Sequence, residues 1–184
     1  MNATDAAEAR CSVREMTESD IDAVAAVRVS AWRHAYAGLM PKAYLDGLSV
    51  AAFAEQRREA FADRSSGVTD LVAVGPDGSV IGWASFGPAT TTDPEGAAPD
   101  EGELSALYAR PDVIGTGVGR ALVAEVLRRA PYPAVRLWVV EGNARARRFY
   151  ERAGFSPDGG TLVEYADGSP VPELRYRRAA AAAR

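Results

Sequence analysis

The sequence has little of what several classes of protein require. Its 184 residues include one cysteine, Cys11, so no disulfide can form within the chain. They include one histidine, His34, and nothing in the sequence brings it beside Cys11, so we interpret the thiol as inert rather than as a nucleophile. No apolar run approaches the roughly 20 residues that a membrane-spanning helix needs. We therefore predict no metal site and no membrane partner.

The chain also lacks an excess of positive charge. The formal net charge is -4 and the isoelectric point is about 5.1, so the chain has no general attraction for nucleic acid, and we predict no such partner. Any anion site must be local. Residues 1–10 are polar and acidic and lack the basic start and apolar core of a secretory signal, so we expect a cytoplasmic protein.

The remaining composition is that of an ordinary globular domain. Hydrophobic residues make up 47% and charged residues 25%, which indicates neither disorder nor a fibre. A chain of this length fits one domain with short tails. We predict a domain over residues 12–178, a flexible tail before it (1–11) and a disordered tail after it (179–184).

Helices precede most of the sheet in the predicted order of elements. The first elements are a strand, a helix with apolar residues at helical spacing, a short helix and a longer one: 12–16, 21–35, 42–48 and 50–64. Two β-rich runs, 69–74 and 79–86, follow around the turn Gly75-Pro76-Asp77-Gly78 and predict an antiparallel hairpin. The polar stretch 88–101 is too long for a tight turn and is interpreted as a mobile insert or part of a binding site.

A strand–helix–strand unit occupies the centre of the chain. The predicted strand 103–109 ends at Pro111, a helix follows the glycines of 115–119, and the apolar run 134–140 is typical of a buried strand, so these two strands should be parallel. A helix over 143–153 ends at Gly154, and the closing strands are expected at 162–165 and 173–177. The fold class is therefore mixed α/β.

The glycine-rich loop predicts an anion site. Gly115, Gly117 and Gly119 lie between a strand and a helix, where the first helical amides lack partners and the helix dipole is positive. A phosphate-binding P-loop is excluded because Gly119 is followed by Arg120-Ala121 rather than Lys and Ser or Thr. A dinucleotide-binding loop is disfavoured by Arg120 and by the preceding antiparallel hairpin. A plain connector remains an alternative.

Two motifs resemble those of the Gcn5-related N-acetyltransferases, the GNAT family, over about residues 12–177. The family pattern Q/R-x-x-G-x-G/A matches residues 114–119 at both glycines, with Ile114 in place of Arg or Gln. The pattern N-x-x-A-x-x-x-Y-x-x-x-G-F matches residues 143–155 at every named position. A softer likeness to the family's first helix covers residues 31–41.

The resemblance implies a V-split, mostly antiparallel sheet of about six to seven strands, with coenzyme A between the fourth and fifth, and acetyl-CoA as co-substrate without a metal. It assigns the pantetheine arm and the pyrophosphate to these residues, partly through their backbone atoms: Leu107, Tyr108, Ala109, Gly115, Thr116, Gly117, Val118, Gly119, Arg120, Asn143, Ala146 and Phe149. We expect Arg120, Arg145, Arg147 and Arg148 either to meet the 3′-phosphate or to form a solvated helix face.

The implied reaction is direct attack of a primary amine on the thioester in a ternary complex. Tyr150 matches the tyrosine that protonates the leaving thiolate, although its pattern also fits a core aromatic. Glu103 is the expected general base, with a solvent-facing carboxylate as the alternative, and the amide of Leu107 or Tyr108 is the expected oxyanion donor. Trp32 fits the apolar stripe, and His34 and Tyr36 border the acceptor region in relatives.

The resemblance leaves the acceptor open. It indicates a small-molecule or peptide amine, and dimers are frequent in the family, so a homodimer is compatible with it. The alternative function is an acyl-CoA-binding sensor or partner module that has the same fold and no turnover. The retained Asn143 and Tyr150 favour the enzyme, whereas Ile114 gives the binding module slight support.

Overall fold

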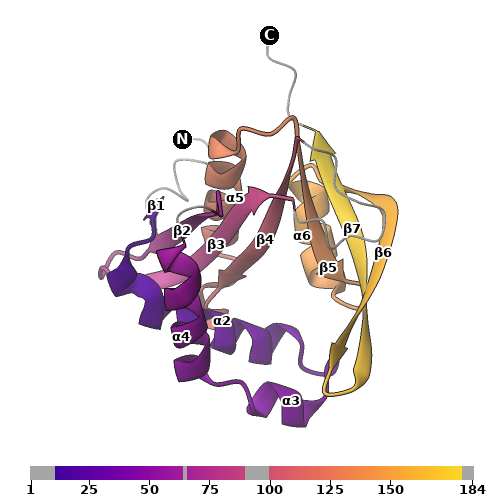
Figure 1. The fold of residues 1–184 in the computed structure, drawn as a ribbon, viewed down its shortest axis with the longest axis horizontal. Helices are drawn as coiled ribbons and strands as arrows, with labels where there is room; N and C mark the ends of the chain where they lie inside the picture. The colour runs from indigo at the N-terminus through magenta and orange to yellow at the C-terminus, as the bar shows by residue number, and fades with distance from the viewer. Residues whose placement is uncertain (1–10, 64–65, 90–99, 180–184) are drawn as a thin grey trace.

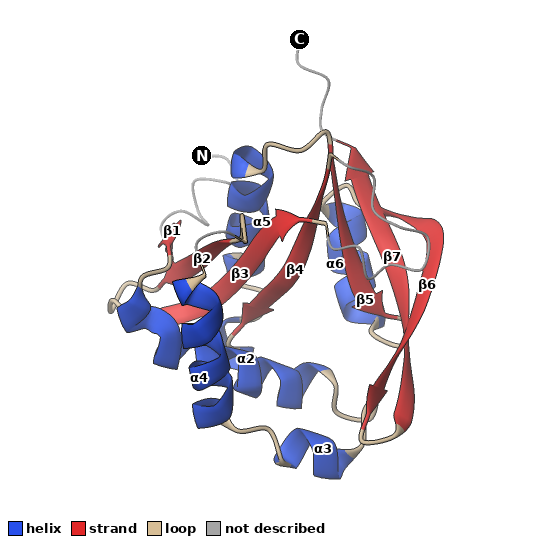
Figure 2. Ribbon diagram, in the orientation of Figure 1, coloured by secondary structure: helices blue, strands red, loops and turns tan. Residues whose placement is uncertain are grey.

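In the computed structural model, which describes residues 11–63, 66–89 and 100–179, a seven-stranded sheet carries helices on both faces (Figure 1; Figure 2). The strand order is β1-β2-β3-β4-β5-β7-β6. The strands are β1 (Ser12–Glu15), β2 (Thr69–Val74), β3 (Val80–Pro88), β4 (Glu101–Ala109), β5 (Ala134–Val140), β6 (Ser156–Ala166) and β7 (Ser169–Ala179). The helices are α2 (Ile21–Ala35), α3 (Lys42–Asp46), α4 (Val50–Ala62), α5 (Val118–Arg129) and α6 (Ala144–Arg152), with short 3₁₀ turns η1 (Glu18–Asp20) and η2 (Pro111–Val113).

The sheet splits between β4 and β5. These strands are parallel and pair over three positions, from Glu101 opposite Ala134 to Glu103 opposite Arg136. Beyond Glu103, β4 pairs only with β3, and β5 continues beside β7, so the two halves of the sheet diverge (Figure 1). All the other neighbouring strands in the described sheet are antiparallel. The predicted mixed α/β fold with a V-split, mostly antiparallel sheet is confirmed.

A bulge in β4 sets which side chains face which layer. Phe86 pairs with Leu104, but its neighbour Ser85 pairs with Ala106, so Ser105 is one residue more than β3 can match. After the bulge, Ala106 and Tyr108 pack with the residues of α2 and α4. The residues between and after them, Leu107 and Ala109, pack on the α5 side. The bulge therefore places Leu104 in the core under α5 and Ala106, two residues later, in the core under α2 and α4.

Two apolar cores hold the helices to the sheet. On one face, α5 and α6 cover a core whose fully buried residues include Leu71, Leu122 and Leu137. On the other face, α2 and α4 cover a smaller core around Val24 and Trp83 (Figure 2). Since apolar burial is the main stabilising contribution to folding, these two cores fix the helix ends that border the split.

The structure extends several predicted elements and shortens others. The hairpin of β2 and β3 and the parallel pair β4–β5 are confirmed. The last two strands are longer than predicted because the turn between them is tight, with left-handed Asp167 (φ 49°) and Gly168 (φ 75°). Much of the predicted insert 88–101 and most of both predicted tails lie outside the described residues. No helix in the described part of the chain is long and apolar enough to cross a membrane.

Candidate active site in the split of the sheet

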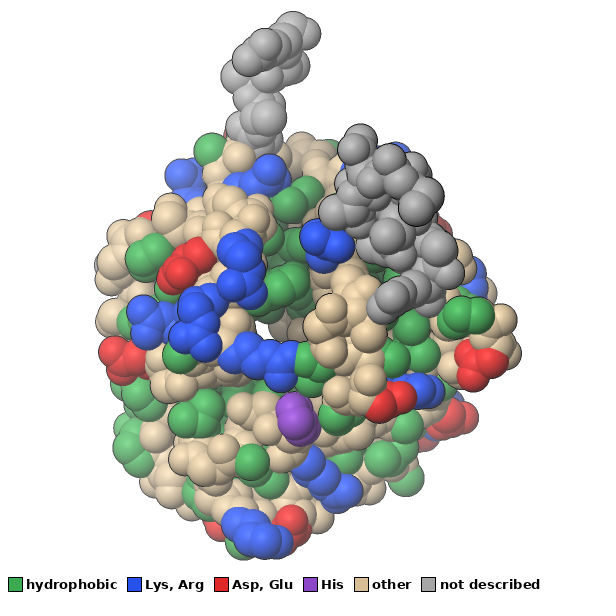
Figure 3. All heavy atoms as spheres, turned by 180° about the vertical axis from the view of Figure 1, so that it is seen from behind, with side chains coloured by type: hydrophobic (Ala, Val, Ile, Leu, Met, Phe, Trp, Pro, Cys, Tyr) green, Lys and Arg blue, Asp and Glu red, His purple; other side chains and the backbone are tan. Residues whose placement is uncertain are grey.

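A cleft of about 990 Å³ opens where β4 and β5 separate. Its walls come from the second half of β4, the loop before α5, the first turns of α5 and α6, and the end of α2. Seen from behind, the molecule is hollowed at its centre, and Lys and Arg side chains surround the hollow (Figure 3). The cleft thus unites segments that lie far apart in the sequence.

The glycine loop forms one wall of the cleft. Gly115 (φ 86°) and Gly117 (φ 104°) have left-handed backbone conformations, which explains why glycine stands at both positions. Gly117 is the N-cap of α5, and Ala121 donates the first intrahelical hydrogen bond to its carbonyl (2.9 Å). The amides of residues 118–120 precede that bond and have no acceptor within the helix. They offer an anion three donors at the positive end of the helix dipole.

The other residues of the loop differ in the groups that they can offer to a ligand. Thr116 donates both its hydroxyl and its amide to the carbonyl of Val113 (2.7 and 3.2 Å), so its hydrogen bonds hold the loop itself. The side chain of Val118 is buried in the core, which leaves only its amide for a ligand. Ile114 lines the cleft, but its apolar side chain supplies no donor where the family pattern has Arg or Gln.

Three arginines line the cleft. Arg120 and Arg145 are two of the four that the sequence predicted. Arg147 instead donates to the hydroxyl of Tyr176 (3.1 Å) and to the carbonyl of Glu141 (3.3 Å), so it stabilises the surface of α6. Arg148 is exposed and is not among the lining residues. Arg152, which no motif marked, lines the cleft one turn further along α6.

Helix α6 and its N-cap residue supply another wall. Asn143 is the N-cap of this helix, and its side-chain oxygen accepts a hydrogen bond from the amide of Ala146 (3.1 Å). Its side-chain amide nitrogen remains available as a donor toward the cleft. Ala146, Phe149 and Tyr150 follow at helical spacing, and all three line the cleft.

Tyr150 lies where the two walls meet. Its ring packs edge-on against Phe149 (5.3 Å between centroids) and Phe155 (5.9 Å). Burial raises the pKa of its phenol above the usual value, and the nearby Tyr108 adds to the rise. The hydroxyl therefore keeps its proton at neutral pH and is available as a donor.

The end of β4 borders the same space. Leu107, Tyr108 and Ala109, which the sequence predicted to contact the pantetheine arm, all line the cleft. Because β5 has diverged by this point, the backbone groups of β4 that face it have no partner in the β4–β5 ladder. Backbone donors and acceptors of this kind can bind an extended ligand as an added strand would.

Glu103, the predicted general base, is engaged elsewhere. It lies at the last parallel pair before the split and is not among the residues that line the cleft. Both Nε and Nη2 of Arg136, a side chain that is 1% exposed, lie 3.1 Å from its Oε2. Arg136 also lies 3.9 Å from Glu101, which in turn accepts a hydrogen bond from Arg177 (2.7 Å). This buried network occupies the carboxylate that sequence reasoning assigned to proton transfer.

The end of α2 closes the cleft with aromatic residues. Trp32 is half-buried, and Tyr36 (5.2 Å between centroids) and Tyr108 (6.4 Å) pack against it. Tyr36 and His34 line the cleft, so both predicted border residues reach it. Cys11 instead packs against the core on the α5 side, and burial raises the pKa of its thiol, the reverse of an activated cysteine.

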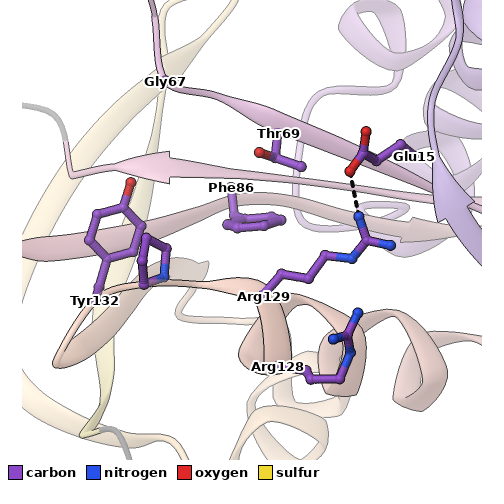
Figure 4. A pocket seen from close by; sticks show the side chains of 8 residues that line it. Glu15, Gly67, Thr69, Phe86, Arg128, Arg129 and Tyr132 are labelled. Carbon is purple, nitrogen blue, oxygen red and sulfur yellow. Dashed lines mark hydrogen bonds and ion pairs between the residues drawn. The ribbon is translucent and has the colours of Figure 1, made fainter.

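A second, smaller hollow lies away from this site. It has a volume of about 450 Å³ and is lined by residues of β1, β2, β3 and the end of α5 (Figure 4). Its arginines are already paired, because Arg129 bonds to Glu15 (2.6 Å) and Arg128 bonds to Glu125 (2.7 Å). Within the part of the chain that the structure describes, no group of three His, Cys, Asp or Glu side chains is placed to hold a metal ion.

Comparisons with known proteins agree with this geometry. The sequence model of the acetyltransferase (GNAT) family matches residues 26–155, so the chain belongs to that family. It is 37% identical over 136 residues to the uncharacterized N-acetyltransferase YuaI of Bacillus subtilis, covering 72% of this chain and 73% of that protein. It is 29% identical to a probable N-acetyltransferase of Mycobacterium tuberculosis over 90% of this chain and 91% of the other.

Solved structures show the same fold. The PaiA N-acetyltransferase of Thermoplasma acidophilum, crystallised in complex with coenzyme A, superposes with a TM-score of 0.69 at 20% identity over 92% of this chain and 98% of that one. The ribosomal-protein-alanine N-acetyltransferase of Brucella melitensis gives 0.71 at 25% identity over 91% and 99%. The predicted family and the predicted acyltransferase class are confirmed, and family membership supports acetyl-CoA or coenzyme A as co-substrate.

Proposed function

We propose that the protein transfers the acetyl group of acetyl-CoA to a primary amine by direct attack in a ternary complex. The observation that carries the proposal is the alignment along one cleft of the free amides at the start of α5, the donor group of Asn143 and the Tyr150 phenol. A diphosphate at the glycine loop would direct the pantetheine arm along α6 toward Tyr150. Ala146 and Phe149 would line its path.

The residues of the cleft fit such a ligand chemically. The loop offers backbone donors and two left-handed glycines, and Arg120 and Arg145 supply positive charge beside it. Bound acetyl-CoA supplies the activated acyl group. The Tyr150 hydroxyl donates a proton to the departing sulfur, and an amide of β4, at Leu107 or Tyr108, stabilises the negative charge that develops on the acyl oxygen.

The acceptor belongs to the class of amines. Relatives whose names state an acceptor point to different members of it: peptidyl lysine in Escherichia coli, a ribosomal-protein alanine in Brucella melitensis, and phosphinothricin for a solved structure with 23% identity. We therefore choose an alanine-terminated peptide, a lysine-containing peptide and phosphinothricin as the test panel.

The test is release of free thiol from acetyl-CoA with each amine of this panel, together with calorimetric titration of coenzyme A. We expect coenzyme A binding and amine-dependent release of thiol. Binding without any release would favour the acyl-CoA-binding module instead. Absence of binding would contradict the assignment of the cleft as a whole.

A further inference from the structure

A glutamate of β7 lies on the acceptor side of the split. Glu173 pairs directly with Val140 at the end of β5, and opposed residues of an antiparallel pair project to the same face of a sheet. Val140 packs with Tyr36 and Leu39 at the end of α2 and beyond it. The next residue, Leu174, packs on the opposite face with the core under α5 and α6. Glu173 therefore faces the end of α2.

Glu173 does not itself line the cleft, but it is electrostatically close to two residues that do. Burial raises the pKa of the Tyr36 and Tyr108 phenols, and the charge of Glu173 adds to the rise in both. Both tyrosines border the space beside Tyr150. A proton that reaches Glu173 would thus leave the cleft on the side bordered by Tyr36 at the end of α2.

In the described part of the chain, no Lys, Arg or His side chain forms an ion pair with Glu173. Glu101 and Glu103, by contrast, are paired with the guanidinium groups of Arg136 and Arg177. The groups that face Glu173 are Glu164 of β6, Glu103 and Tyr108 of β4, and Tyr36 of α2. Arg175, two residues along β7, bonds to Asp158 (2.9 Å).

This environment affects the acidity of the Glu173 carboxyl group. Burial raises the pKa of Glu173 to about 7, and the charges of Glu164 and Glu103 contribute to the rise. A base whose pKa lies near the working pH combines a populated basic form with useful proton affinity. The other acidic groups nearby also favour a cationic ligand, such as an ammonium group.

We propose that Glu173, rather than Glu103, accepts the proton of the acceptor's ammonium group, and this inference rests on the proposed function. The ammonium gives one proton to Glu173 through an intervening water, because Glu173 does not itself line the cleft, and the freed nitrogen lone pair forms the C–N bond. As the C–S bond breaks, the sulfur gains a proton from Tyr150, and the second proton lost by the nitrogen passes through solvent to the resulting phenolate and restores Tyr150. The proton on Glu173 then leaves to solvent, so the net products are the amide, the free thiol and one proton.

The test compares Glu173→Gln with wild-type protein, using the panel amine with the fastest wild-type turnover. Since the basic form of Glu173 is the active one, wild-type kcat/KM should rise with pH through an apparent pKa near 7. The variant should lack this limb and lose at least about tenfold in kcat/KM at pH 7. Its rate should recover as the pH approaches the pKa of the amine itself, about 10.4 for a lysine side chain.

Two controls separate this role from a structural one. Glu59→Gln makes the same chemical change at an exposed position of α4 and should retain the wild-type pH profile. Calorimetric titration of coenzyme A should show that Glu173→Gln is folded and binds it as the wild type does. A wild-type acidic limb in Glu173→Gln would overturn the proposal while leaving the proposed function intact. A wild-type protein that releases no thiol would overturn both.

Discussion

Tyr150 combines two properties that substitution can separate. Its ring packs against Phe149 and Phe155, and its hydroxyl lines the cleft. Packing of the ring would by itself explain an aromatic residue at this position of α6, even if Tyr150 had only a structural role. Only the hydroxyl can donate a proton, so removing the oxygen alone tests the chemical role.

Tyr150→Phe is expected to lower kcat at least about tenfold, because a positioned general acid contributes roughly 10²–10⁴-fold. Both edge-on ring contacts persist in the variant, so the melting temperature and the coenzyme A affinity should change little. Steady-state kinetics, thermal unfolding and calorimetric titration provide the measurements. Tyr165→Phe is the matched control, since that ring is 70% exposed on β6. Wild-type turnover by Tyr150→Phe would remove the phenol from the mechanism.

At the level of residues, the sequence predicts backbone roles better than side-chain partners. Gly115, Gly117 and Gly154 have left-handed backbone conformations that few other residue types adopt, so the glycine pattern indicates where these turns lie. The partner of Glu103 could not be predicted in the same way. Arg136 lies on a strand that is adjacent only after the chain has folded, and neither residue has a local pattern that indicates an ion pair. The proximity of Glu173 to Tyr36 could not be predicted either, because the two residues are far apart in the sequence and come together only in the fold.

At the level of elements, the site depends on how close α5 lies to β3. A Cβ atom at Gly82 of β3 would lie 2.9 Å from side-chain carbons of both Leu122 and Val118, closer than real contacts allow. The absence of a side chain at Gly82 thus lets α5 approach the sheet. Because Gly117 and the free amides form the start of the same helix, this approach also fixes their position.

Gly82→Ala should therefore destabilise the fold by about 1–3 kcal/mol, the usual cost of overpacking a core. It should also weaken coenzyme A binding, because α5 must move away from β3. Chemical denaturation and calorimetric titration test these expectations. In the double variant with Leu122→Ala, one of the two clashing carbons is removed, so the loss should be smaller than the sum of the single losses. Strict additivity would show that the two positions do not compete for space.

The elements themselves were largely predictable, and the split of the sheet was predictable only through the family resemblance. Local patterns gave the β2–β3 hairpin and the parallel relation of β4 and β5. The divergence after Glu103 depends on the bulge at Ser105 and on β7 pairing with β5, and both are long-range properties. The predicted insert ended at residue 101 and the predicted strand began at residue 103, whereas β4 includes both Glu101 and Gly102. In the structure this glycine accommodates the ring of Tyr132, which would lie 2.2 Å from a Cβ atom.

At the level of the whole molecule, the sign of the charge at the cleft is opposite to the sign of the net charge. The net charge is -4, which would repel a polyphosphate at long range. Arg120, Arg145 and Arg152 nevertheless line the cleft, and positive side chains surround the hollow on that face (Figure 3). The arginines at the cleft therefore attract an anionic co-substrate locally. Dissolved salt can screen this attraction.

Coenzyme A affinity should therefore fall as ionic strength rises. The Debye length shortens from about 10 Å at 0.1 M to about 3 Å at 1 M salt, so the dissociation constant should rise several-fold over that range. Arg120→Gln should weaken binding and flatten the salt dependence, whereas Ile114→Arg, which places a cation on the same loop, should tighten binding and steepen it. Lys42→Gln changes the net charge equally, but at an exposed position of α3, and should match the wild type. Equal effects of Arg120→Gln and Lys42→Gln would mean that overall charge, rather than the cleft arginines, governs binding.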